Sequence, residues 1–188
     1  RTTKYNDGSD IPNVTDKDIW EMQKTGAYRN LKDSESNAAT YGRFYNWYTI
    51  KTGKLAPAGW HVPTDNEWVI LQEYLINNGY NWDGTKEGNK IAKALASTTG
   101  WVSSKFSREG EPGFQPEKNN KTGFSAPPCG FYNLNGFLIQ EGQYCNFWTS
   151  DFENILEADY VSLYYGNESL DGAFVEKTSG FFVRLVKD

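Results

Sequence analysis

The sequence is poor in the residues that build most metal and redox sites, with one histidine and two cysteines among 188 residues. These counts exclude most His-rich and Cys-rich metal sites. Basic residues are not in excess either, because 19 Lys and Arg stand against 24 Asp and Glu. Nucleic-acid binding needs a basic face, so we expect no nucleic-acid partner. No window of the sequence holds the roughly 20 consecutive apolar residues of a membrane span.

Aromatic residues, by contrast, are abundant, with 7 Trp, 12 Tyr and 11 Phe. The mean hydropathy of −0.70 is polar enough for a disordered chain, but disordered chains are poor in aromatic residues. Together with 18 glycines, this composition favours a loop-rich fold around a small core of packed rings. The length suits one domain over residues 1–188.

The clearest local signal is a helix that begins after Thr64. Thr64 and Glu67 form the S/T-x-x-E capping box, which satisfies free N–H groups at a helix start. Trp68, Leu71 and Leu75 follow at i, i+3 and i+7, on one face of a helix. The sequence therefore predicts a helix that ends at the Asn-Gly pair of residues 78–79.

Weaker signals surround this helix. A helix with its cap at Thr15 is expected to end near Gly26, and another is expected over residues 89–97. Residues 27–40 are polar and are predicted to be a loop. The ring-rich residues 41–50 fit a helix or a strand equally well, because a short aromatic run does not settle the period.

The second half of the chain carries strand signals. A long loop is predicted over residues 101–123, followed by strands over 147–150, 158–165 and 180–186. Asn135-Gly136 and Glu141-Gly142 are hairpin-type turn signals. Helices first and strands later predict an α+β fold with a meandering antiparallel sheet.

Several sequence blocks occur in a characteristic order. The most specific is Gly-Trp-His-Val-Pro-Thr-x-x-Glu-Trp at residues 59–68, and another is Gly-Phe-Phe-Val-Arg-Leu-Val at 180–186. Further blocks lie at residues 3–16, 26–28, 41–48, 122–126 and 147–150. In this order the blocks resemble the Fibrobacter succinogenes major paralogous domain family, from about Thr3 to the end. The usual opening strand of that family would lie before Arg1, so we expect it to be missing here.

The resemblance implies a C-type lectin-like fold, shared with formylglycine-generating enzymes. In that fold two to three helices pack on small antiparallel sheets, with long loops. It also implies a secreted or cell-surface protein of Bacteroidetes-type bacteria, associated with the outer membrane only through a lipid anchor outside this sequence. Some relatives diversify ligand-facing residues near the C-terminus. We expect a monomer.

The resemblance divides the rings into two groups. Trp47, Trp60, Trp68 and Trp148 lie in family blocks and are expected in the core. Rings in the variable stretches are candidates to stack on a ligand, with Asn and Asp side chains fixing its polar groups. The predicted ligand-binding residues are Tyr132, Tyr144, Asn146, Asp151, Phe152, Tyr164, Tyr165 and Asn167. The competing interpretation is that these are exposed strand residues without a ligand.

Both cysteines stand where the family usually has glycine. Cys129 and Cys145 flank the predicted hairpin, and in the secreted setting implied by the resemblance we expect a disulfide between them. Closing a loop of this length would stabilise the fold by about 3 kcal/mol. The alternatives are two separate buried thiols, or a catalytic or copper-binding pair like that of formylglycine-generating enzymes.

Two further residues and two short motifs are candidates for a structural or functional role. His61 lies inside a family block, so a structural role is expected and a catalytic one is the alternative. Arg184 alternates with apolar neighbours, which predicts an ion pair with a carboxylate under the sheet. Calcium is the one cofactor considered, because residues 111–113 and 81–84 faintly resemble lectin calcium motifs. Ordinary turns are the competing interpretation of both motifs.

These observations predict a non-catalytic ligand-binding or adhesion module, with a glycan or protein bound on the surface of residues 130–178. One alternative is a structural subunit of a surface or fimbrial assembly, which requires an exposed edge strand or patch. The other is an enzyme of the formylglycine-generating type, which requires a functional thiol pair.

Overall fold

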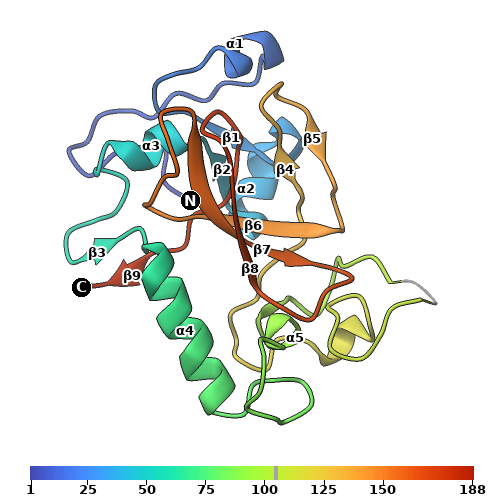
Figure 1. Cartoon of the computed structure of the whole chain (residues 1–188). Coiled ribbons are helices and arrows are strands. Elements are labelled where there is room, and N and C mark those ends of the chain that lie inside the picture. The colour runs from blue at the N-terminus through green and yellow to red at the C-terminus, as the bar shows by residue number, and fades with distance from the viewer. Residues whose placement is uncertain (104–105) are drawn as a thin grey trace.

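The computed structural model describes residues 1–103 and 106–188. In that part of the chain all five α-helices lie before residue 96, and the largest sheet lies after residue 143 (Figure 1). The helices are short apart from one, and the strands form small antiparallel sheets joined by long loops. The fold is therefore α+β and loop-rich, as the order of the sequence signals predicts.

Helix α4 (Asp65–Asn77) is the longest element and begins as predicted. The Thr64 hydroxyl accepts from the Glu67 N–H at 3.2 Å, and the Glu67 carboxylate accepts from the Thr64 N–H at 2.9 Å. Trp68 and Leu75 are buried against the rest of the domain. The capping box and the apolar spacing are both confirmed. Both signals are local, because they lie within the first turns of the helix itself.

The other predicted helices are shorter than expected. Helix α1 (Lys17–Glu21) is capped by Asp16, which accepts from the N–H groups of Asp18 and Ile19, and not by Thr15. Helix α5 (Ala92–Leu95) occupies the centre of the predicted 89–97 segment. A helix of this length is not stable by itself, so most of its stability comes from packing against the rest of the domain.

The prediction of a loop over residues 27–40 is wrong. This segment holds strand β1 (Tyr28–Asn30), the 3₁₀ turn η1 (Leu31–Asp33) and helix α2 (Glu35–Tyr41). Strand β1 pairs antiparallel with β2 (Arg43–Tyr45), and helix α3 (Trp47–Lys51) follows at once. Both alternatives for residues 41–50 are therefore realised in turn. A three-residue strand has no readable period, so only its partner reveals it.

The second half contains more pairing than predicted. Strands β4 (Phe131–Tyr132) and β5 (Leu138–Ile139) form the hairpin expected at Asn135-Gly136. The turn at Glu141-Gly142 leads into β6 (Tyr144–Trp148), which pairs with β7 (Glu157–Tyr164) instead of β5. Strand β8 (Asp171–Glu176) was not predicted and pairs with the other side of β7.

The last predicted strand is mostly irregular. Phe181 and Phe182 form isolated bridges with Tyr45 and Phe147, and β9 (Val186–Lys187) pairs with β3 (Trp60–His61). The predicted long loop holds the 3₁₀ turn η2 (Pro116–Lys118) in its described part. Gly180 forms a further bridge with Tyr132 of β4, so the closing segment joins all four sheets of the described residues.

The core consists of packed rings, as the composition indicates. Phe44 stacks on Phe182 with centroids 4.4 Å apart, and Trp148 lies 4.5 Å from Phe181. Such pairs contribute roughly 0.5–1.5 kcal/mol each beyond the area they bury. Trp47, Trp68 and Trp148 are buried, as predicted. The prediction for Trp60 is wrong, because its side chain at the short β3–β9 ribbon is 43% exposed.

Candidate ligand-binding site

Two of the predicted ligand-binding residues are part of the core. Tyr132 is 2% exposed and its hydroxyl donates to the carbonyl of Asn30 at 2.9 Å. Asn146 is equally buried at the centre of β6 and accepts from the Ser162 hydroxyl at 2.7 Å. The prediction for both residues is wrong, since neither can touch a ligand. Sequence alternation shows that strand faces differ, but it does not show which face is covered.

Three predicted tyrosines lie together on the β6–β7 ribbon. Tyr144 and Tyr164 face each other across the two strands, with centroids 4.6 Å apart, and Tyr165 lies 4.6 Å from Tyr164. A hydrogen bond with Tyr165, followed by desolvation, raises the pKa of Tyr164 to about 12. The rings are half-buried and mutually satisfied. They form a row of packed rings on the ribbon, and none of them lines one of the depressions described below.

The remaining predicted residues lie in two different loops. Asn167 is in the β7–β8 turn, where its amide donates to Asp171 at 2.6 Å. Asp151 follows β6 and accepts from the backbone N–H of Asp65 at 2.7 Å, at the first turn of α4. Phe152 comes next and is 58% exposed. Of the predicted set, Phe152 is the ring that both reaches solvent and borders a depression.

That depression, here called the Phe152 pocket, has a volume of about 530 Å³. It is lined by α3 and its C-terminal turn, by the loop after β6, and by a lysine that follows β8. The lining residues are Trp47, Ile50, Lys51, Gly53, Ser150, Phe152, Asn154, Ile155 and Lys177. The ring of Phe152 packs edge-on to Trp47 with centroids 5.5 Å apart. Trp47 is buried and Phe152 is 58% exposed, so the lining includes one ring from the core and one that reaches solvent.

Lys177 holds this pocket together. Its ammonium lies 4.7 Å from the ring centre of Trp47 and 4.5 Å from that of Phe152, and it donates to the carbonyl of Asn154 at 2.5 Å. Cation–π contacts of this kind contribute about 0.5–2 kcal/mol. Burial, and then the charge of Lys51, lowers the pKa of Lys177. The buried cation therefore fixes Phe152 and the loop in one position.

Lys177 and Asn154 were not singled out by sequence reasoning, although both lie inside the predicted 130–178 surface. Trp47 was assigned to the core alone. No sequence pattern links these residues, because Trp47 lies in α3 whereas Lys177 follows β8, far along the chain. Only the fold brings the three groups together.

A second depression of about 460 Å³ adjoins the first and shares Ile50, Gly53 and Ser150 with it. Trp60 and His61 line its far side. His61 Nε2 lies 2.7 Å from Glu67, and its Nδ1 lies 2.6 Å from Asp188. These hydrogen bonds, first with Asp188 and then with Glu67, raise the pKa of His61. His61 thereby joins β3, α4 and the final residue, which is the structural role expected for it.

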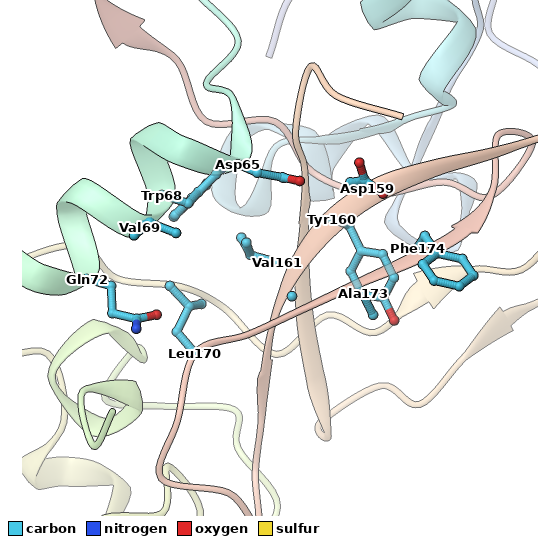
Figure 2. A pocket seen from close by; sticks show the side chains of 11 residues that line it. Asp65, Trp68, Val69, Gln72, Asp159, Tyr160, Val161, Leu170, Ala173 and Phe174 are labelled. Atoms are coloured by element: carbon cyan, nitrogen blue, oxygen red, sulfur yellow. The ribbon is translucent and has the colours of Figure 1, made fainter. Parts of the chain in front are cut away.

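A third cavity, of about 260 Å³, lies between α4 and strands β7 and β8 (Figure 2). Asp65 and Asp159 project into its upper end from α4 and β7, above Trp68 and Leu170 (Figure 2). Burial first, and then the charge of Asp65, raises the pKa of Asp159 to about 6. The neighbouring negative charge disfavours the ionised form of Asp159, so this carboxyl group keeps its proton to a higher pH than an ordinary aspartate.

The calcium prediction has no support from the two motifs that suggested it. Asn81 donates to the carbonyls of Thr85 and Gly88, and Asp83 pairs with Lys90. Glu111 accepts from the backbone N–H of Arg108 at 2.8 Å. These groups stabilise turns. No cluster of three or more His, Cys, Asp or Glu side chains suited to a metal occurs among the described residues.

The structure holds Cys129 and Cys145 as free, buried thiols, so the predicted disulfide is not formed in it. The residue directly opposite Cys145 in the backbone bridge is Gly130, and Cys129 is offset by one residue. Burial raises the pKa of Cys129 to about 12, and burial followed by the neighbouring thiol raises that of Cys145. Both thiols pack as small apolar groups and stay protonated at neutral pH.

Arg184 does not form the predicted ion pair. Its guanidinium lies 4.3 Å from the ring centre of Phe124 and donates to the carbonyl of that residue at 2.6 Å. None of the ion pairs in the described part of the chain includes it. The alternation of this segment is not that of a regular strand, so Arg184 lies beside the core instead of under a sheet.

The chain is thus a loop-rich α+β domain, and aromatic residues line each of the three depressions described above. A family model described as the Fibrobacter succinogenes major domain matches residues 1–187, so the chain belongs to that family. This confirms the resemblance seen in the sequence blocks. No curated protein and no solved structure matches the chain. None of the helices in residues 1–103 and 106–188 combines the length and apolar character that crossing a bilayer requires.

Proposed function

We propose that this domain is a non-catalytic ligand-binding module and that the Phe152 pocket is its ligand site. The observation that carries the proposal is an exposed ring held in place by a buried cation. Lys177 fixes Phe152 against Trp47 at the mouth of a depression large enough for a sugar ring or a side chain. A preorganised ring loses little freedom on binding, which favours affinity.

The ligand is a glycan or a protein. A glycan is supported by the flat face of Phe152 next to polar groups of Ser150, Asn154 and Lys51. A protein is supported by the apolar tip of the same loop, where Ile155 is 85% exposed and Leu156 is also exposed. Both ligands would use Phe152, so its removal tests the site whichever ligand binds.

The test compares Phe152→Ala with Phe137→Ala on a glycan array and against candidate surface proteins. Phe137 is similarly exposed but lies in the β4–β5 hairpin, so it is a matched control. We expect Phe152→Ala to weaken binding about tenfold, the loss of one stacked ring contact, and Phe137→Ala to leave it unchanged. Equal binding by both variants and the wild type would refute the site.

The C-type lectin-like fold, the secreted or cell-surface location and the monomeric state are part of this proposal. Small antiparallel sheets, few helices and long loops support the fold assignment. The location, including a lipid anchor outside this sequence, is proposed only from what the family resemblance of the sequence blocks implies. Protease accessibility on intact cells tests the location, and light scattering tests the monomer.

A structural role in a surface assembly is the second candidate, and β8 favours it. Within the described residues β8 pairs only with β7, and its first four residues, Asp171 to Phe174, are exposed. An open edge of this kind can accept a strand from another chain. A concentration-dependent increase in mass by light scattering would favour this role, and a constant monomer mass would exclude self-assembly through β8.

The enzyme alternative, of the formylglycine-generating type, depends on the thiols. Buried, protonated cysteines are poor nucleophiles, which supports a packing role for Cys129 and Cys145. Replacing both with alanine should lower thermal stability only. Loss of an oxidase-type activity in a variant that stays folded would instead support the enzyme.

A further inference from the structure

A fourth depression, here called the arginine pocket, has the opposite charge from the rest of the domain. It has a volume of about 450 Å³ and is lined in part by Arg1, Arg43 and Arg184. None of the described residues that line it is an aspartate or a glutamate. The whole chain has a net charge of −5, so this concentration of positive charge in one concavity is local.

The three arginines differ in how far they are already paired. Arg43 is buried and bonded to Glu35 at 2.5 Å and to the carbonyl of Arg1 at 3.1 Å. It also lies over the ring of Tyr28 at 4.7 Å. These contacts give Arg43 a structural role at the base of the pocket.

Among the described residues, neither Arg184 nor Arg1 has a carboxylate partner of the kind that Glu35 provides for Arg43. Arg184 donates to the carbonyl of Phe124 at 2.6 Å, and Arg1 donates to that of Thr40 at 3.3 Å. Among the ion pairs of the described residues, none uses either side chain. Both side chains are exposed, and both line the same depression. Two guanidinium groups that lack a carboxylate partner among the described residues therefore share one concavity.

The other walls suit a ligand with both polar and apolar parts. The rings of Phe124, Phe147 and Phe182 line the apolar side. Arg184 stacks on Phe124 at 4.3 Å, which holds its planar guanidinium in one orientation. Thr40, Tyr41 and Ser125 line the pocket as well and carry hydroxyl groups. A fixed guanidinium is well suited to an oxyanion, because its N–H groups match two oxygens at once.

We propose that the arginine pocket binds the oxyanion group of an acidic ligand, a carboxylate, sulfate or phosphate, with Arg184 as the principal contact. The pocket shares no lining residue with the Phe152 pocket. Anion binding in the arginine pocket therefore goes beyond the proposed function, and each of the two sites can be tested without the other. An anion there balances the positive charges that line the pocket and gives Arg184 the charged partner that none of the ion pairs of the described residues supplies.

The experiment is a calorimetric titration of the protein with sodium glucuronate, sulfate and phosphate at constant ionic strength, with chloride as the background anion. The three probes distinguish a carboxylate from the other two oxyanions. We expect binding of at least one probe, weakened by added salt. Arg184→Gln should weaken it roughly tenfold or more, the loss expected for one charge-assisted contact.

Arg108→Gln is the matched control, because it removes the same charge from an 87% exposed side chain outside the pocket. Arg184→Lys keeps the charge without the planar fork and should bind with intermediate affinity. If Arg184→Gln fails to fold, Arg1→Gln and Arg184→Lys still report on the pocket. No binding of any probe by the wild type, or equal affinity in the Arg184 and Arg108 variants, would overturn the proposal.

Discussion

Replacing Asp159 with asparagine should stabilise the domain at neutral pH. Asp159 projects into the cavity between α4 and β7 together with Asp65. Its pKa is raised from 3.8 to about 6, first by desolvation and then by the charge of Asp65. A carboxylate in this position is less stable in the folded state than in the unfolded chain. Asparagine removes the charge and keeps a donor for Asp65.

The direction and the magnitude of this change in folding stability follow from the linkage between folding and proton binding. Below pH 3.8 the aspartic acid is protonated in both states and costs nothing. As the pH rises towards 6, the unfolded chain loses the proton first, so folding stability falls and then stays constant. The full change in pKa corresponds to at most about 3 kcal/mol at ~1.4 kcal/mol per pH unit. Because Asp159 is only partly buried, solvent screening reduces the expected gain to about 1 kcal/mol.

Urea unfolding of wild type and Asp159→Asn at about pH 4 and about pH 7.5 measures the effect. The variant should gain stability at the higher pH and little at the lower one. Glu21→Gln removes an equal charge from the exposed end of α1 and controls for net charge. An Asp159→Asn gain that is the same at both pH values, or no larger than that of Glu21→Gln, would refute the reasoning.

Two further predictions concern His61 and the thiols. Because the pKa of His61 is raised by Asp188 and Glu67, its stabilising effect is complete below its ordinary pKa of 6.5 and is lost as the pH rises through the folded value. His61→Gln should therefore lower the melting temperature at about pH 5.5 and match the wild type at about pH 9. A decrease in melting temperature that is the same at both pH values would contradict this role of His61. With no reductant present, Cys129 and Cys145 should react with a thiol reagent only after the protein has been denatured. A mass two hydrogens lower, with no labelling, would show a disulfide instead.

Helix α4 and the ring-packed core could be predicted because their signals are local or compositional. The Thr64 and Glu67 cap lies within one turn, and the burial of Trp68 and Leu75 follows from helical spacing. The abundance of aromatic residues predicts a ring core without any knowledge of which ring meets which. The family blocks could likewise be read from the chain, and residues 1–187 match the family model.

The candidate site could be predicted only as a region. Phe152 is exposed as expected, whereas Tyr132 and Asn146 are buried. All three lie in short strands or the loops between them, where one residue of difference in register reverses the side-chain direction. The pairing of β6 with β7 sets the register of Asn146, and the pairing of β4 with β5 sets that of Tyr132. Such pairing depends on segments distant in sequence.

The sequence by itself determined the family, the α+β class, the capped helix and the aromatic character of the core. Only the tertiary structure decided that Trp47, Phe152 and Lys177 form one pocket and that Arg1 and Arg184 share another. The physical reason is that Trp47 lies more than a hundred positions from Phe152 and Lys177, and Arg1 lies still farther from Arg184. The energies of these contacts depend on burial and on the distance between charges and rings, and neither is a property of local sequence.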